Sequence, residues 1–251
     1  MFFIKMTLLK FEKIINNILF ALFLLIPFVL ITGSFLPDLF LSLSAVLLIV
    51  LLVKKNQLEF FKNKFFFYFL FLYFLFIFSS LISSNIRLSI VSSVFYIRFI
   101  VFIFVTIYLI ENNKNFFNYL FYIMIVIYSV LFLDTLFQFF YGKNIIGLYY
   151  LNESNYRNTS FFGNRGVLGS YTIRLLPLLL ALISIKFYKN LLYKKYLIIL
   201  FFFLSGAIIL LSGERTAFFL FCILVCSTFI FIKELRVQIS LFCLIFLLFT
   251  I

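Results

Sequence analysis

The sequence predicts an all-α, polytopic transmembrane helical bundle of about nine spans with a cytoplasmic N-terminus. Of its 251 residues, 66% are hydrophobic and only 12% are charged, too little polar material to cover a water-soluble domain. The apolar residues form continuous runs near the length of a membrane helix and do not alternate with polar ones. This pattern favours helices over the strands of a membrane β-barrel.

Nine apolar runs follow one another along the chain, and short polar segments separate them. The expected spans are residues 18–35, a second run that follows a turn at Pro37-Asp38 and ends at residue 53, and then residues 65–82, 90–110, 117–140, 167–187, 196–211, 216–232 and 238–251. The longest polar segment, residues 141–165, is expected to be an extended loop on the outer side. The ninth run covers only 14 residues, which rise about 21 Å as a helix and so fall short of a hydrocarbon core of about 30 Å. We therefore expect the natural protein to continue beyond Ile251.

The charges predict the orientation of the spans. With the N-terminus inside, 14 of the 21 Lys and Arg residues lie in inner segments, five in outer segments and two within spans. Cytoplasmic loops of membrane proteins carry such an excess of basic residues. The net charge of +13 therefore indicates topology and not nucleic-acid binding. The chain has no His, and its three Cys residues lie in apolar runs without metal-site spacing, so neither a metal nor a cofactor is expected.

The ionisable residues within or beside the spans all fall in the expected outer half of the membrane. Arg98, Asp134 and Arg174 lie roughly 9–12 Å from the outer ends of their spans, at 1.5 Å per residue, and Arg215 stands at the outer entrance of the eighth. Several purely structural interpretations exist. Arg215 can extend its side chain to the membrane–water interface. Arg98 and Arg174 can each pair with Asp134. Asp134 and Gln138, at positions i and i+4 of one helix, can hold that helix against a neighbour. The surplus of arginine favours binding of an anion, and the guanidinium fork suits phosphate oxygens.

Small residues gather at the outer entrance of the sixth span. Gly166, Ser170 and Arg174 are spaced by four and share one helical face, which allows a ligand or another helix to approach closely. The N-terminus of a helix also carries free N–H groups that attract anions. Close helix packing alone is the alternative explanation for the glycines.

Two segments carry a resemblance to a known family. The first, residues 162–177, begins Phe-Gly-Asn-Arg-Gly-Val-Leu-Gly-Ser-Tyr and contains Arg174 and Pro177; the second, residues 211–217, reads Leu-Ser-Gly-Glu-Arg-Thr-Ala. In this order and spacing they resemble the core region of the O-antigen ligase and O-antigen polymerase family. The resemblance implies a single membrane domain, with five spans in residues 1–140, a periplasmic loop at 141–165 and the start of the core region at 166–251.

Members of that family are bacterial inner-membrane glycosyltransferases that act on the periplasmic side without a metal or a nucleotide sugar. The implied substrate is an undecaprenyl-diphosphate-linked oligosaccharide, and the implied acceptor is lipid A core or a second lipid-linked glycan. Arg215 and Arg174 are the implied catalytic residues. The candidate lipid diphosphate-binding residues are Arg98 (chosen by its depth alone), Arg165, Asp134, Glu214, Gly163 and Asn164.

Other functions remain open at this stage. The family carries a large periplasmic loop after about this many spans, often with an acceptor-activating His. The chain stops at that point, so we expect those residues to be missing from this segment. A flippase or transporter for an anionic lipid or solute is the main alternative, although the apolar inner halves of the spans offer no polar path. A structural subunit of a membrane complex is the third. Whether the enzyme would be a ligase or a polymerase depends on its acceptor.

Overall fold

A computed structural model describes residues 2–33, 35–62, 64–149, 157–163 and 165–240. These residues are almost entirely helical, and their only strand-like pairing is an isolated bridge between Lys143 and Tyr149. The chain divides into two compact units, Met1–Phe116 and Phe117–Ile251. The all-α prediction is therefore confirmed over the described part of the chain.

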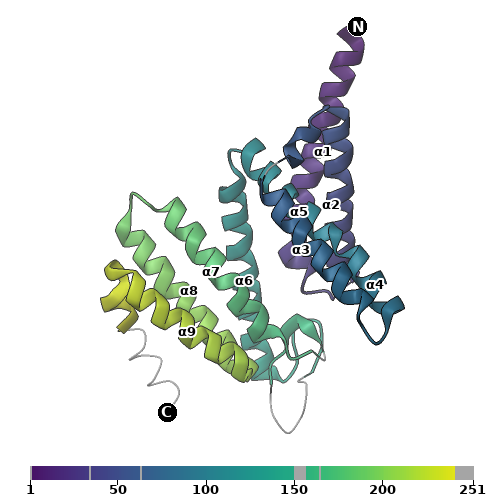
Figure 1. Ribbon diagram of the computed structural model, residues 1–251. Helices are drawn as coiled ribbons and strands as arrows, with labels where there is room; N and C mark the ends of the chain where they lie inside the picture. Colours follow the sequence, from purple (N-terminus) through teal and green to yellow (C-terminus); the bar gives the residue numbers. More distant parts are fainter. Residues whose placement is uncertain (1, 34, 63, 150–156, 164, 241–251) are drawn as a thin grey trace. The chain divides into compact units, whose positions relative to one another are not determined.

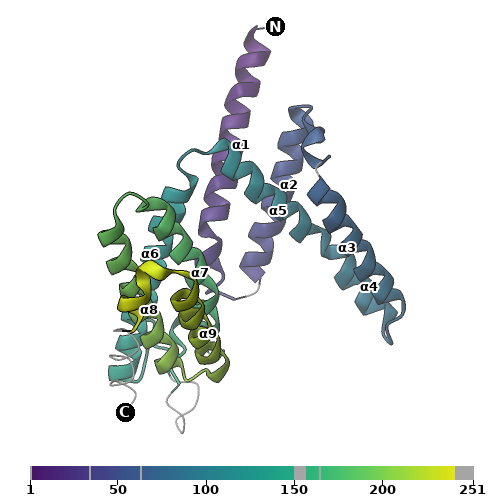
Figure 2. The same ribbon diagram turned by 60° about the vertical axis from the view of Figure 1, so that its left-hand side comes forward.

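The N-terminal unit contains five α-helices: α1 (Phe2–Val29), α2 (Phe35–Lys54), α3 (Lys64–Leu81), α4 (Ile86–Phe95) and α5 (Ile97–Asn112). Within this unit α2 packs against both α1 and α5, while α3 and α4 form a hairpin (Figures 1 and 2). Large apolar side chains such as Leu48, Leu52, Phe104 and Leu109 are buried where these helices meet. A single turn of 3-10 helix, η1 (Leu58–Phe61), links α2 to α3.

The C-terminal unit contains α6 (Phe116–Tyr141), α7 (Leu168–Lys186), α8 (Leu191–Ser212) and α9 (Arg215–Phe231), with short 3-10 turns η2 (Ser160–Phe162) and η3 (Lys233–Leu235). Figure 1 shows α7 beside α8 and α8 beside α9. Helix α6 reaches its neighbours through large side chains. The buried Tyr128 hydroxyl donates to the Thr172 carbonyl of α7 at 2.7 Å, and its ring meets Phe201 of α8 edge-on at 5.8 Å.

Seven described helices are long and apolar enough to cross a membrane, or eight if α9 and the segment 233–240 form one span with a bend of 109°. Phenylalanines on α3 support the same conclusion, since Phe71 and Phe78 are 62% and 63% exposed. Exposed faces of this kind are stable against lipid and not against water. The protein is a membrane protein. Eight of the nine predicted runs coincide with helices, and most of the ninth lies outside the described residues.

Two predicted boundaries were wrong. The first run was expected to extend to Phe35, but α1 ends at Val29 and a turn follows, in which Gly33 adopts φ +130°. Pro37-Asp38 was expected to be a turn between the first two runs, but α2 starts at Phe35 and includes both residues. Pro37 occupies the first turn of the helix, where a missing N–H costs nothing. The fourth run, expected over residues 90–110, lies within one candidate span, Ile86–Asn112, but this span starts earlier and has a break at Tyr96 between α4 and α5.

Candidate functional site

The start of α7 is joined to the turn between α8 and α9 by the side chain of Glu214. One carboxylate oxygen accepts a hydrogen bond from the Gly169 N–H at 2.7 Å. The other accepts from the Ser170 N–H at 3.0 Å and from the Ser170 hydroxyl at 2.6 Å. A carboxylate at a helix N-terminus satisfies N–H groups that have no partner within the helix and lies at the positive end of the helix dipole. We call this contact the Glu214 joint, made by Gly169, Ser170, Ser212, Gly213 and Glu214.

Local sequence makes the turn that delivers Glu214. Gly213 has φ +63° and ψ +19°, the left-handed conformation that commonly ends a helix and suits glycine. The Gly213 N–H donates to the Leu210 carbonyl, and the Glu214 N–H approaches the Ser212 hydroxyl at 3.4 Å. The chain thus reverses within a few residues, and α9 begins at Arg215 directly after the capping carboxylate.

The joint occupies the position where an external anion was expected. The N-terminus of the sixth span was predicted to offer free N–H groups, but the Gly169 and Ser170 N–H groups are bonded to Glu214. That part of the prediction was wrong, because the acidic residue that completes this helix lies about 45 residues later in the chain. The anion at this helix end is the protein's own carboxylate.

Gly169 allows the two segments to approach closely. A Cβ atom on Gly169 would lie 2.6 Å from the Ser212 hydroxyl oxygen and 2.9 Å from Ala217 Cβ, both inside normal contact distance. Gly166, three residues earlier, has no atom within 4 Å of the equivalent position. The glycine cluster of the sequence therefore contains one residue required by packing and one that is not.

Gly169→Ala is expected to lower the free energy of unfolding by about 2 kcal/mol, since the added methyl group overpacks the joint. Gly166→Ala is the matched control and is expected to change it by less than about 0.5 kcal/mol. The chain has no Trp, so unfolding in detergent is followed by circular dichroism during a titration with SDS. Equal effects of the two substitutions would show that the close approach at Gly169 is not required.

The loop after α6 is held by two buried side chains of that helix. Asp134 accepts from the Ile145 N–H at 2.9 Å and from the Ser160 hydroxyl at 2.5 Å. Gln138, one turn later, accepts from the N–H groups of Thr159 and Ser160 at 2.9 and 2.7 Å. Both side chains are fully buried. The shared face of these two residues was predicted, with helix joining as one interpretation; the structure shows that they bind the loop.

Two asparagines complete the folding of this loop. The Asn144 side chain accepts from the Leu148 N–H at 2.7 Å and donates to the Ser160 carbonyl at 2.9 Å. Asn158 donates from its side chain to the Thr135 carbonyl of α6 and from its backbone to the Leu211 carbonyl of α8. The loop is thereby attached to both helices, and the next residue back along the chain, Arg157, lies against the Glu214 joint.

Three arginines surround the joint. A Cβ atom on Gly213 would lie 3.2 Å from Arg157 Cγ, so the stem of this arginine crosses the turn. Arg174 is exposed one helical turn after Ser170, on the same face of α7, and Arg215 is exposed beside Glu214. No ion pair to any of the three is present within the described ranges. Among the described residues Glu214 supplies one negative charge beside these three positive ones, and it is fixed on α7 by its hydrogen bonds.

The remaining predicted site residues have varied positions. Arg98 belongs to the N-terminal unit and pairs with Asp38 at 3.1 Å, not with Asp134 as the structural alternative supposed. Arg165 is exposed two residues before the N-cap of α7, and Gly163 adopts φ +59° at the end of η2. Asn164 lies outside the described residues. Arg215 adjoins Glu214 at the joint, and Arg174 lies one turn of α7 beyond Ser170.

Sequence reasoning missed Arg157, Asn144 and Asn158. Arg157 entered only as one of the outer charges, and no local pattern connects it with Gly213. The two asparagines lie in a polar loop, where such residues are common and carry no periodic signal. Their roles depend on contacts with distant segments.

Comparison with known proteins gives no relative for this chain: no family model, no curated protein and no solved structure matches it.

Proposed function

We propose that this chain forms part of a membrane glycosyltransferase of the O-antigen ligase and polymerase type, which uses a lipid diphosphate-linked oligosaccharide as donor. The substrate would be an undecaprenyl-diphosphate-linked glycan, joined to lipid A core or to a second lipid-linked glycan. The support is the resemblance of residues 162–177 and 211–217 to that family, together with the arrangement of charged groups around the Glu214 joint.

One observation carries the proposal: Arg174 and Arg215 are exposed at the joint while Glu214 is engaged by the N-terminus of α7. Each oxygen of this carboxylate accepts a short hydrogen bond from α7, and no ion pair joins it to either arginine among the described residues. The Asp134 carboxylate of the same unit is likewise engaged, by the Ser160 hydroxyl and the Ile145 N–H. The guanidinium groups are therefore available to an external anion, and their planar donors match phosphate oxygens.

The reaction follows from this assignment. An acceptor hydroxyl attacks the anomeric carbon of the donor sugar, the new C–O bond forms, and the bond between that carbon and the diphosphate oxygen breaks. The diphosphate leaves with the bonding electron pair. Arg215 and Arg174 stabilise the charge that develops on it, as donors placed at a leaving group do in other enzymes. The described residues assign no base to the acceptor proton.

The proposal includes a membrane arrangement. The spans number nine in a bacterial inner membrane, the N-terminus is cytoplasmic, and the Glu214 joint faces the periplasm. The excess of Lys and Arg in the alternate segments supports this orientation. Arg165 and Gly163 would lie beside the lipid diphosphate, and the whole segment would act as one membrane domain.

Replacing Arg215 by Ala tests the function. In the bacterium that carries the protein, Arg215→Ala and Arg215→Lys are expected to lower surface polysaccharide about 100-fold or more, since loss of one preorganised donor to a developing charge has effects of this size. Polysaccharide is measured on gels of whole-cell extracts, and the membrane content of the protein by immunoblot. Arg87→Ala, at an exposed arginine of the N-terminal unit, is the control and is expected to leave the polysaccharide unchanged.

Normal polysaccharide with Arg215→Ala protein present in the membrane would refute the assignment. A second assay separates the enzyme from a transporter. Vesicles that contain the protein and a labelled undecaprenyl-diphosphate glycan are expected to show transfer of the glycan to an acceptor. Movement of the labelled lipid between leaflets without transfer would instead support the flippase alternative.

A further inference from the structure

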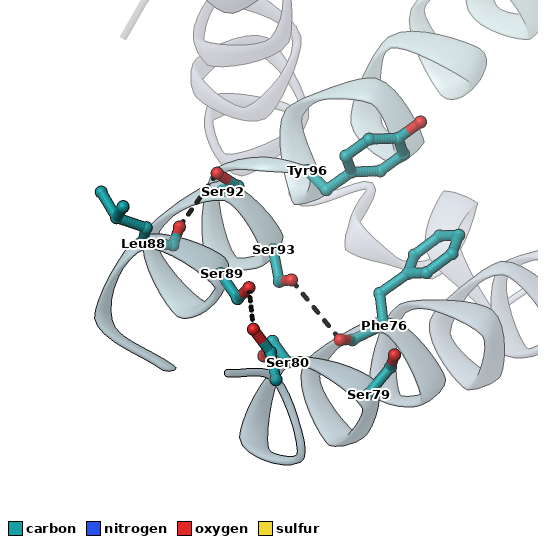
Figure 3. A pocket seen from close by; sticks show the side chains of 9 residues that line it. Phe76, Ser79, Ser80, Leu88, Ser89, Ser92, Ser93 and Tyr96 are labelled. Carbon is teal, nitrogen blue, oxygen red and sulfur yellow. Dashed lines mark hydrogen bonds between the residues drawn. The ribbon is translucent and has the colours of Figure 1, made fainter. Parts of the chain in front are cut away.

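The hairpin of α3 and α4 borders an open pocket of about 480 Å³, which none of the candidate-site arginines lines. Figure 3 shows its walls: Ser79 and Ser80 project from α3, and Ser89, Ser92 and Ser93 project from α4. With Ser83 from the connecting turn, six serines line it, and none of its lining residues is charged. A membrane helix hairpin with this number of hydroxyl groups around an open volume is suited to a polar, neutral ligand.

The hydrogen bonds of these serines determine which ligand groups fit. Ser80, Ser92 and Ser93 donate their hydroxyl protons to the carbonyls of Ile77, Leu88 and Phe76. Ser83 and Ser89 share one bond at 2.7 Å, which uses a proton of one of them. Each oxygen keeps capacity to accept. The wall therefore presents mostly acceptors, which favours a ligand rich in hydroxyl donors and disfavours phosphate and carboxylate groups.

An aromatic pair borders the same pocket. Phe76 of α3 and Tyr96, at the break between α4 and α5, have ring centroids 5.3 Å apart and are 48% and 47% exposed. Aromatic faces pack well against the C–H face of a sugar ring, while hydroxyl acceptors bind its edge. A lipid ammonium group would also meet acceptors here, but the pocket has no carboxylate to balance its charge.

A second pocket of about 240 Å³ lies nearer the N-terminal end of α3. Its walls are apolar and include Phe66, Leu70 and Tyr73 of α3 and Ile97 and Ile100 of α5. The α3 residues of the apolar pocket, ending at Tyr73, precede those of the serine pocket, starting at Phe76, and Tyr96 of the serine pocket precedes Ile97 of the apolar one. From Phe66 to Ser80 helix α3 rises about 21 Å, a large part of the thickness of a hydrocarbon core.

We infer that the N-terminal unit binds a neutral glycolipid, with its sugar in the serine pocket and part of a hydrocarbon chain in the apolar pocket. The ligand class follows from the acceptor-rich wall, the aromatic pair, the lack of charge and the apolar pocket on the same helix. The inference does not rest on the proposed glycosyltransferase function, because it concerns different residues and is tested by binding alone.

Native mass spectrometry of the detergent-purified full chain tests the inference. The probes are monoglucosyl-diacylglycerol, the diacylglycerol with the same chains, phosphatidylglycerol and phosphatidylethanolamine. The glucolipid is expected to bind at least about tenfold more tightly than the diacylglycerol, the scale of two or three added hydrogen bonds. Ser92→Leu fills the serine pocket and is expected to abolish this preference. Leu70→Trp fills the apolar pocket and is expected to weaken the binding of the glucolipid and of the diacylglycerol equally.

Ser42→Leu is the matched control, because Ser42 on α2 makes the same backward hydrogen bond to a carbonyl four residues earlier as Ser92 does. It is expected to bind lipids like the unmodified chain. Circular dichroism checks that each variant is folded, and Ser79→Leu replaces Ser92→Leu if the latter is not. Equal binding of glucolipid and diacylglycerol, a preference unchanged by filling the pocket, or preferred binding of either phospholipid would overturn the inference.

Discussion

Glu214→Ala is expected to lower the free energy of unfolding by about 3 kcal/mol, because three donors of α7 lose a charged acceptor. Two of them are backbone N–H groups at 2.7 and 3.0 Å, and the third is the Ser170 hydroxyl at 2.6 Å. The N–H groups at the start of a helix have no alternative partner within the helix. The start of α7 and the α8–α9 turn are expected to separate in the variant.

Glu214→Gln keeps one acceptor oxygen but turns an amide NH₂ group toward donors, so about half of the loss is expected. Glu59→Ala is the control: Glu59 pairs with Lys62 at 2.9 Å, but both side chains are more than 70% exposed, and such a pair contributes less than about 1 kcal/mol. The measurement is the SDS titration monitored by circular dichroism. A Glu214→Ala effect no larger than that of Glu59→Ala would contradict the structural role of the joint.

Asp134→Ala is expected to have an effect of similar size, about 3 kcal/mol, because a fully buried acceptor is removed from two donors. The Ser160 hydroxyl and the Ile145 N–H would lose their partner on α6. Arg157 is expected to become less fixed in position, because it lies in the same short segment as Asn158 and Ser160. Hydrogen exchange at the amides of Ile145 and Ser160 is expected to accelerate in the variant.

Two further substitutions calibrate this result. Ser160→Ala removes only the hydroxyl donor and is expected to cost about half as much as Asp134→Ala. Leu133→Ala, at the neighbouring residue of α6, alters a side chain that is 62% exposed and is expected to cost less than about 1 kcal/mol. If Asp134→Ala and Leu133→Ala lower the free energy of unfolding equally and show the same amide hydrogen exchange, Asp134 does not hold the loop.

The membrane class of the fold was predictable because it depends on the length and composition of local segments. A helix must satisfy its own backbone in lipid, so a long apolar run is sufficient to indicate one. The ends of the helices were less predictable, since the hydropathy of a segment does not determine its backbone dihedral angles. Helix α1 ends at Val29, before the turn in which Gly33 has positive φ, and Tyr96 interrupts the fourth run although its neighbours in the sequence are apolar.

The candidate site was predictable in part. Arg174, Arg215 and Glu214 were selected from the sequence by depth and by motif; the structure places Glu214 against the start of α7, with Arg215 next to it in the chain. Their partners were not predictable. Asp38 for Arg98, the Gly169 and Ser170 N–H groups for Glu214, and Ser160 for Asp134 are separated from them by 60, about 45 and 26 residues. No local periodicity encodes contacts at such separations.

The sequence by itself determined that the chain enters a membrane as a series of helices, since that outcome needs only apolar segments of sufficient length. The tertiary structure alone decided which charges are compensated. Glu214 binds the end of α7 and leaves Arg215 exposed beside it, because a carboxylate that lies against unpaired N–H groups gains more by accepting from them than by pairing with an arginine in solvent.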